Sequence, residues 1–197
     1  MPSATETRTR ASALPADQRR AAIVDATLPL LYEHGATVST RQIAEAAGIA
    51  EGTIFRVFPD KQALLQAAVE TAFDTAPIEE AIAAIDRGQP LEGQLVEAMR
   101  LLQSRFATIW RLLPVARDLG VIRPGAPKRP DVRAVTELLT PFADELRLDP
   151  ETSARRLRSM ALATSHPGFE PEGPPPAEEI VTLLLDGLRR PARKGRR

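Results

Sequence analysis

The stretch GIAEGTIFRVFPDK, residues 48–61, combines side chains that suit contact with a nucleic acid. Arg56 can donate a pair of hydrogen bonds to guanine or hold a phosphate, and Thr53 can donate to a phosphate oxygen. Gly52 has no side chain, so its backbone can come close to a groove. The stretch therefore suggests contact with double-stranded DNA, provided that these three residues share an exposed side.

A helical wheel divides this stretch into two sides. At about 100° per residue, Ile54, Val57 and Phe58 fall on one side, and the glycine and the arginine fall opposite. Phe55 lies on a flank between the two sides. It can lie against a thymine methyl group or a sugar in a DNA complex, or it can pack under the preceding helix. The spacing alone leaves both possibilities open.

The elements around this stretch have the pattern of a helix-turn-helix. Ser39 and Gln42 have the S-x-x-Q spacing of a capping box, which predicts that a helix begins there and ends at Gly48. A second short helix is expected from about residue 50 to residue 58, and Asp60 is placed to cap a third. Two short helices joined by a tight glycine turn present the second helix to the DNA major groove.

The rest of the chain also has helical spacing, which predicts an all-α fold. Apolar residues recur at helical intervals from Pro15 to Glu33, where Pro29 is expected to kink the helix without breaking it. We expect an N-terminal three-helix head over residues 17–62 and a C-terminal helical domain over residues 63–190. Two proline-rich stretches, VIRPGAPKRP and HPGFEPEGPPPAEE, are expected to be loops between helices.

The composition argues against several classes of protein. The 197 residues include no cysteine, which excludes disulfides and thiolate metal sites and fits a reducing cytoplasm. No apolar run reaches the roughly 18–20 residues of a membrane helix, and the N-terminus has no apolar segment typical of a secretory signal. The histidines are His34 and His166, and neither belongs to an H-E-x-x-H motif. An enzyme is therefore the weaker hypothesis, and no cofactor or metal is expected.

The charge is balanced, with 26 basic and 26 acidic residues, but it is uneven along the chain. Residues 187–197 carry six basic residues and no acidic one, and residues 1–20 carry four arginines against two acidic residues. The helix-turn-helix stretch, residues 39–61, holds three residues of each sign, so we expect modest affinity for DNA. A disordered basic arm over 1–16 is expected to add phosphate contacts. Basic ends of a chain, including a tail over 191–197 here, are more often simply solvated.

An apolar stripe in LEGQLVEAMRLLQSRFATIWRLL, residues 91–113, indicates either core or a ligand pocket. Its apolar positions recur every three or four residues from Leu95 to Leu113, and Gln103 lies away from the centre of the stripe. A stripe of large side chains more often forms plain core. If a pocket exists, we expect it to take a mainly apolar ligand and to be lined by Met99, Phe106, Trp110, Phe142 and Met160.

The last expected helix, EEIVTLLLDGLRR (residues 178–190), carries apolar residues nearly all the way round, which indicates contact with a partner. An end helix of a small domain cannot bury every side against its own chain. SARRLRSMALAT, residues 153–164, carries alanines that permit close approach of a second helix. We therefore expect a two-fold homodimer with a four-helix interface that includes Ala154, Leu157, Ala161, Ile180, Leu184 and Leu188.

The motif TRQIAEAAGIAEGTIFRVFPDKQALL, residues 40–65, resembles the DNA-binding signature of TetR-family transcriptional regulators. AAIVDATLPLLYEHG and EEIVTLLLDGLRR are similar to the first and last helices of that family. The resemblance implies phosphate contacts for Thr40 and Lys61, and a base or backbone contact for Arg41. Phe55 stands where the family most often has a tyrosine whose hydroxyl touches a phosphate. The resemblance also implies a cluster of base and phosphate contacts at the start of the recognition helix, made by Glu51, Gly52 and Thr53.

The resemblance implies a bacterial, cytoplasmic repressor of transcription. The region beyond the head would bind a mainly apolar small molecule and form the homodimer. The dimer would place two heads in successive major grooves of a palindromic operator. Ligand binding would favour a conformation with the wrong spacing of the heads and so release the DNA. The alternative is a helix-turn-helix regulator without a small-molecule ligand, controlled by a protein partner or by its own concentration.

Overall fold

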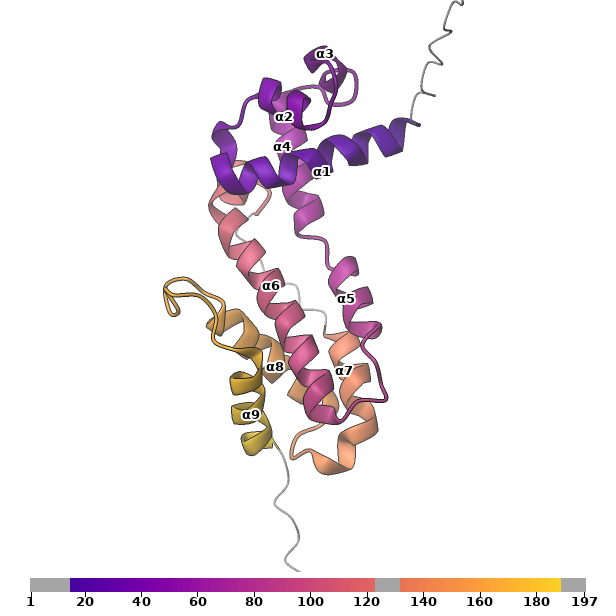
Figure 1. The fold of residues 1–197 in the computed structure, drawn as a ribbon, viewed down its shortest axis with the longest axis vertical. Helices are drawn as coiled ribbons and strands as arrows, with labels where there is room; N and C mark the ends of the chain where they lie inside the picture. The colour runs from indigo at the N-terminus through magenta and orange to yellow at the C-terminus, as the bar shows by residue number, and fades with distance from the viewer. Residues whose placement is uncertain (1–14, 123–131, 189–197) are drawn as a thin grey trace, which may run out of the picture. The chain divides into compact units, whose positions relative to one another are not determined.

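The chain forms two compact units built from helices (Figure 1). The computed structural model describes residues 15–122 and 132–188, so most of the expected arm and all of the expected tail lie outside the described residues. The first unit ends at Ala68 and the second begins at Val69. The predicted all-α fold is confirmed. The elements are α1 Ala16–His34, η1 Gly35–Thr37, α2 Thr40–Ala46, α3 Glu51–Ile54, α4 Lys61–Ala72, α5 Ala76–Ala83, α6 Leu91–Asp118, α7 Arg133–Leu139, η2 Thr140–Glu145, α8 Pro150–Thr164 and α9 Ala177–Leu188.

The first unit has an apolar core to which α1, α2 and α3 all contribute. Ile23 and Leu31 of α1 and Ile43 of α2 are each at most 2% exposed. α1 continues through Pro29 without a break, as predicted, although the proline removes one backbone donor. The hydroxyl of Thr27, which is also buried, donates to the Ile23 carbonyl at 2.7 Å, so this polar group has a partner inside the core.

The second unit is organised around α6. Figure 1 shows α8 and α9 along one side of α6 and α5 and α7 along the other. The predicted stripe is buried at Leu95, Met99, Leu102 and Phe106. Side chains from α5, α6, α7, α8 and α9 meet on this stripe in one apolar core. The helices of this unit are therefore held together by burial of the stripe.

The segment from residue 50 to residue 58, called the recognition segment below, is helical over fewer residues than predicted. α3 ends at Ile54, whereas the spacing predicted a helix from about residue 50 to residue 58. The chain continues as hydrogen-bonded turns, in which the N–H groups of Val57 and Phe58 each donate to the Ile54 carbonyl at 2.9 Å. Pro59 restricts the backbone of Phe58 and so keeps a helix from continuing past this segment, but it does not account for the end at Ile54.

α6 extends beyond the predicted stripe. It continues past Leu113 and through Pro114 to Asp118, a stretch in which Val115 and Ala116 are still buried. Gln103 is buried as well, although it lies away from the centre of the stripe. The amide nitrogen of that glutamine donates to the backbone carbonyl of residue 175 at 2.9 Å. This bond ties α6 to the loop before α9, which the sequence did predict as a loop.

A buried carboxylate links α5 to α7. Glu79 is 9% exposed, and its Oε2 accepts the backbone N–H of Ala134 at 2.8 Å, in the first turn of α7. The first N–H groups of a helix have no acceptor within the helix, so the carboxylate satisfies one of them and complements the helix dipole. Burial lowers the pKa of the Arg158 guanidinium on α8, and the charge of Glu79 partly opposes that shift.

Glu79→Ala should lower the free energy of unfolding by about 1–3 kcal/mol, because it leaves the buried Ala134 N–H without its acceptor. Glu79→Gln keeps an oxygen at this place and should lose less. Glu80→Ala is the matched control, since it removes an exposed carboxylate from the next position and should change the free energy by at most about 0.5 kcal/mol. Urea unfolding of the full chain, followed by circular dichroism, measures all three. Equal losses for the two alanine variants would show that the bond to α7 adds nothing.

Candidate nucleic-acid interface

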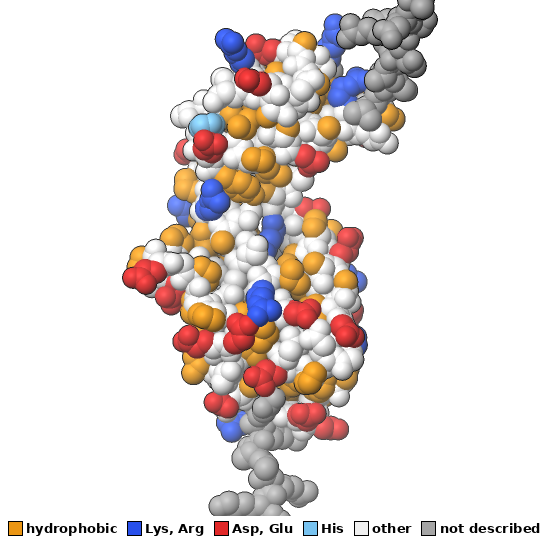
Figure 2. All heavy atoms as spheres, in the orientation of Figure 1, with side chains coloured by type: hydrophobic (Ala, Val, Ile, Leu, Met, Phe, Trp, Pro, Cys, Tyr) orange, Lys and Arg blue, Asp and Glu red, His pale blue; other side chains and the backbone are white. Residues whose placement is uncertain are grey.

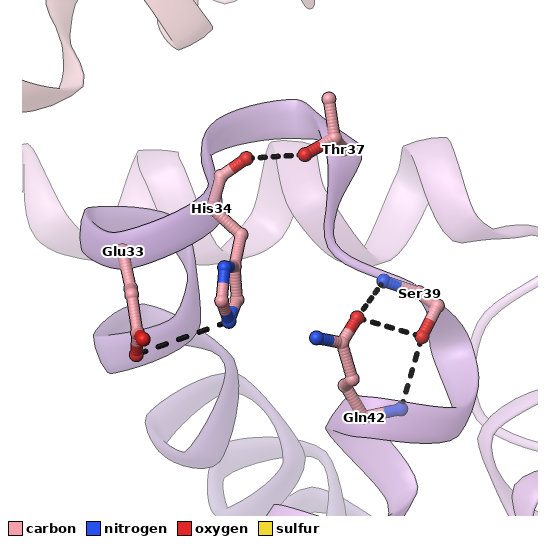
Figure 3. Close-up of polar contacts among 5 residues, drawn as sticks. All are labelled: Glu33, His34, Thr37, Ser39 and Gln42. Carbon is pink, nitrogen blue, oxygen red and sulfur yellow. Dashed lines mark hydrogen bonds and ion pairs between the residues drawn. The ribbon is translucent and has the colours of Figure 1, made fainter.

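A capping box sets the start of α2 (Figure 3). The Gln42 N–H donates to the Ser39 hydroxyl at 3.2 Å, and the Ser39 N–H donates to the Gln42 side-chain oxygen at 2.9 Å. Just before it, the Thr37 hydroxyl donates to the His34 carbonyl at 2.6 Å and closes the turn after α1. The predicted capping box is confirmed, and it makes Thr40 the first residue of α2.

A glycine turn joins α2 to α3. Gly48 has a φ of 64°, a left-handed conformation that a glycine adopts without steric cost. The Ile49 N–H then donates to the Ala44 carbonyl at 3.0 Å and closes the end of α2. The predicted end of the helix at this glycine is therefore confirmed, and the turn brings the chain directly to Glu51 at the start of α3.

The predicted buried and exposed sides of the recognition segment are confirmed for most residues. Ile54 and Phe58 are 0% and 1% exposed, whereas Val57 beside them is only half-buried. Phe55 is 50% exposed, so it is not buried under the preceding helix. Thr53 is half-buried. Glu51, Gly52 and Arg56 are exposed.

The N-terminal ends of α2 and α3 are joined by a side-chain hydrogen bond. The hydroxyl of Thr40 donates to Oε1 of Glu51. The resemblance implied DNA contacts for both residues, but it gave no sign that they bond to each other, because this contact depends on how the two helices pack. Arg41, the next residue of α2, is exposed. The structure therefore brings the predicted contact residues of α2 and α3 together.

The start of α4 places a lysine beside the link between α1 and α2. The ammonium group of Lys61 donates to the Ala36 carbonyl at 3.0 Å. An ammonium group has three N–H donors, so this bond leaves it the capacity to hold a phosphate as well. Asp60 accepts the Ala63 N–H at 2.7 Å, which confirms the predicted cap of this helix.

Arg20 of α1 is a basic residue of this region that the sequence analysis did not select. Its guanidinium carbon lies 4.3 Å from the centroid of the Phe58 ring. A cation over an aromatic face is held electrostatically, so the ring orients this charge beside the recognition segment. The contact joins residues far apart in the sequence, so the spacing of residues carries no signal that could have revealed it.

The first unit has no excess of positive charge. Residues 15–68 contain five lysines and arginines against six aspartates and glutamates. On the face drawn in Figure 2, basic and acidic side chains are interspersed over this unit. Contact with a polyanion would therefore depend on where individual basic groups lie, because the unit as a whole does not attract phosphates.

The residues predicted to line an apolar ligand pocket lie in or on the core of the second unit. Met99 and Phe106 are members of that core, and Trp110, Phe142 and Met160 pack against it. This placement gives the five side chains a packing role in the single chain. A pocket lined by all of them stays a prediction.

The second unit does have surface hollows, and charged side chains contribute to their linings. One, of about 350 Å³, has four carboxylates in its lining, those of Asp74, Glu79, Glu80 and Glu137. Another, of about 300 Å³, is lined by Phe142 together with Arg87, Gln94, Glu137 and Pro141. The side-chain oxygen of that glutamine is buried without a hydrogen-bond donor. Of the five predicted pocket residues, these two hollows include Phe142.

The burial of α8 and α9 contradicts part of the predicted dimer interface. Four of the predicted residues are each at most 4% exposed within one chain, so they have almost no surface to offer a partner: Ala154, Leu157, Ala161 and Ile180. The reason is that these sides of α8 and α9 complete the core on α6. Leu184 is half-buried, and the side chain of Leu188 lies outside the described residues. The outer sides of the two helices expose Ser159, Ala163, Leu183 and Gly187.

Two kinds of site can be assessed over residues 15–122 and 132–188. No group of His, Cys, Asp and Glu side chains in these ranges is arranged to hold a metal ion. None of the helices there combines the length and the apolar character needed to cross a bilayer.

Comparisons with known proteins converge on one family. Residues 23–68 match the family described as "Bacterial regulatory proteins, tetR family". The chain is 30% identical over 184 residues to the HTH-type transcriptional repressor LfrR of Mycolicibacterium smegmatis, a match that covers 87% of this chain and 89% of that protein. It is 36% identical over 90 residues to the repressor KstR of the same species, covering 42% of this chain and 44% of that protein. A solved TetR transcriptional regulator from Streptomyces coelicolor has a TM-score of 0.58 and 25% identity, over 88% of this chain and 99% of the other.

Phe55→Ala should leave the free energy of unfolding within about 0.5 kcal/mol of the wild type, because half of the ring is in solvent and little packing is lost. Ile54→Ala, one residue earlier and fully buried, should lower it by about 2–5 kcal/mol. Urea unfolding of both variants gives the comparison. A loss for Phe55→Ala as large as that for Ile54→Ala would place the ring in the core and remove it from the candidate interface.

Proposed function

Because the chain belongs to the tetR family of bacterial regulatory proteins, we propose that it is a dimeric transcriptional repressor that binds a palindromic operator through α2 and α3. The relatives LfrR and KstR are both named as transcriptional repressors of the helix-turn-helix type. A dimer bound at an operator blocks the polymerase without further machinery, which favours repression as the sign of regulation. Such a protein acts on the chromosome, so we place it in the cytoplasm.

The observation that carries this proposal is the exposed side of the recognition segment. Phe55 is 50% exposed there, next to the exposed Arg56, and a thymine methyl group or a sugar would cover the ring in a complex. Gly52 supports the same conclusion. A Cβ built at this position meets no atom within 4 Å, so packing within the chain does not require a glycine. Close approach of a DNA backbone or base edge would favour a glycine here, because it has no side chain.

The outer sides of α8 and α9 are the surface that we propose for the dimer. Leu183 is 59% exposed on α9, and it is flanked on that side by Gly187. Ser159 and Ala163 supply small exposed positions on α8. Small residues permit two helices to approach closely, and an exposed leucine gains from burial. The predicted four-helix interface is thus kept, with its contact side moved from the buried residues to the exposed ones.

A small-molecule effector bound in the second unit is part of the proposal. Such a ligand would bind more tightly to a conformation whose two heads do not match the operator, and DNA would be released. The alternative, a regulator without a small-molecule ligand, is favoured by one observation: Met99 and Phe106 are buried in the core, and the other predicted pocket residues pack against that core in the single chain. Displacement of bound DNA by a metabolite or drug would separate the two.

Footprinting of DNA from around the chain's own gene, at fixed salt, should show a protected palindrome. Arg56→Ala and Thr53→Ala should each weaken protection by about tenfold or more, because each removes a contact to a base or a phosphate. Arg117→Ala is the matched control, since it removes an exposed arginine from α6 and should leave protection unchanged. Absence of protection at every salt concentration, with a folded dimer present, would contradict the proposed function.

Light scattering at micromolar concentration should give the mass of a dimer. Leu183→Arg should give a monomer, because it buries a charge in the proposed interface. Leu148→Arg replaces another exposed leucine, which precedes α8, and should remain a dimer. A monomeric wild type, or a dimer that persists in Leu183→Arg, would show that α9 does not form the interface through this side.

A further inference from the structure

We propose that Glu51 competes with DNA for the hydroxyl of Thr40 and thereby sets the sequence specificity of the head, an inference that rests on the DNA-binding function proposed above. In the free protein this hydroxyl donates to Oε1 of the carboxylate. The two residues begin α2 and α3, the helices that form the helix-turn-helix. Their hydrogen bond therefore lies between the two elements that would face the DNA.

A threonine hydroxyl has a single hydrogen to donate. A phosphate oxygen can only accept, so a phosphate contact by Thr40 requires that hydrogen. The carboxylate of Glu51 already holds it in the free protein. The two acceptors are alternatives, and DNA can gain the threonine contact only when the hydrogen bond to the glutamate is released.

The released carboxylate would be in an unfavourable place. Glu51 is exposed at the first position of α3, the helix that would enter the major groove. A negative charge there lies close to the phosphates of bound DNA, and it has lost its hydrogen-bond donor. Binding to an arbitrary sequence therefore carries a cost that a neutral residue at position 51 would not impose.

Certain bases can offset this cost. In the major groove, a carboxylate can accept a hydrogen bond from an exocyclic amino group, which cytosine presents at N4 and adenine at N6. Guanine and thymine present acceptors at the corresponding edge and repel it. We therefore assign to Glu51 the choice of an amino-bearing base at one position of each half-site. The hydrogen bond to Thr40 is the state of the free protein, and the bond to the base replaces it on the correct sequence.

The test compares the full-length protein with four variants on two kinds of DNA. A pool of random duplexes is bound, and the bound fraction is sequenced to give the base preference at every position. Dissociation constants are then measured at one salt concentration for the best duplex and for an unrelated duplex. Glu51→Gln removes the charge but keeps an oxygen that can accept from Thr40. Glu45→Gln makes the same change of charge on the exposed side of α2 and is the matched control. Thr40→Val and the double variant Thr40→Val/Glu51→Gln complete a cycle.

Glu51→Gln should bind the unrelated duplex about threefold to tenfold more tightly than the wild type. It should also lose a preference for cytosine at one position of each half-site, because its amide donates as well as accepts and pairs with adenine instead. Glu45→Gln should keep the preference of the wild type. Thr40→Val should weaken binding to both duplexes. The gain from Glu51→Gln should shrink when Thr40 is already valine, because the amide oxygen is a weaker acceptor than the carboxylate and this difference matters only while the threonine hydroxyl is present.

Other outcomes overturn the proposal. If Glu51→Gln keeps both the base preference and the ratio of affinities of the wild type, the carboxylate plays no part in specificity. If it weakens binding to both duplexes equally, while its melting temperature falls, the hydrogen bond to Thr40 only supports the fold. If the wild type binds no duplex in the pool, the DNA-binding function itself fails, a result distinguishable from the other two because it does not depend on position 51.

Discussion

Burial of Ile54 and Phe58 in the core of the first unit is the constraint on which the candidate interface depends. These two side chains fix the rotation of the recognition segment, and rotation alone decides which residues point outward. Phe58 packs in the core, and its ring also contacts the guanidinium of Arg20. The exposed residues of α3 are thus positioned by the packing of the buried residues beside them.

Short helices need support from outside themselves. α2 and α3 are too short to be stable as isolated helices, so caps and contacts between elements must hold them. Ser39 caps α2, and Lys61 ties the start of α4 to Ala36. The bond from Thr40 to Glu51 belongs to this set, and it differs from the others because both partners are also candidate DNA contacts. The Thr40 hydroxyl and the Glu51 carboxylate can either hold the two helices together or contact DNA, but not both at once.

The sequence predicts the features that depend on neighbouring residues. The capping box at Ser39, the glycine turn at Gly48 and the two-sided recognition segment follow from local spacing, and the structure confirms them. Features that depend on packing between distant elements were missed. Gln103 is buried because a loop more than sixty positions later supplies its acceptor, and Ile180 faces its own core because α6 covers that side. Apolar spacing marks a side for burial, but it does not say whether the chain itself or a partner covers it.

The charge of the first unit explains why DNA binding and dimerisation belong together in the proposed function. With five basic and six acidic residues over 15–68, one head gains little from general attraction to phosphates. Joining two heads in a dimer makes the second contact intramolecular and raises affinity without new contacts. That gain is lost as soon as the spacing of the heads no longer matches the operator. In the proposed dimer, a change within the second unit would release DNA while every contact residue of α2 and α3 keeps its local structure, so the proposed control requires no contact between an effector and the recognition segment.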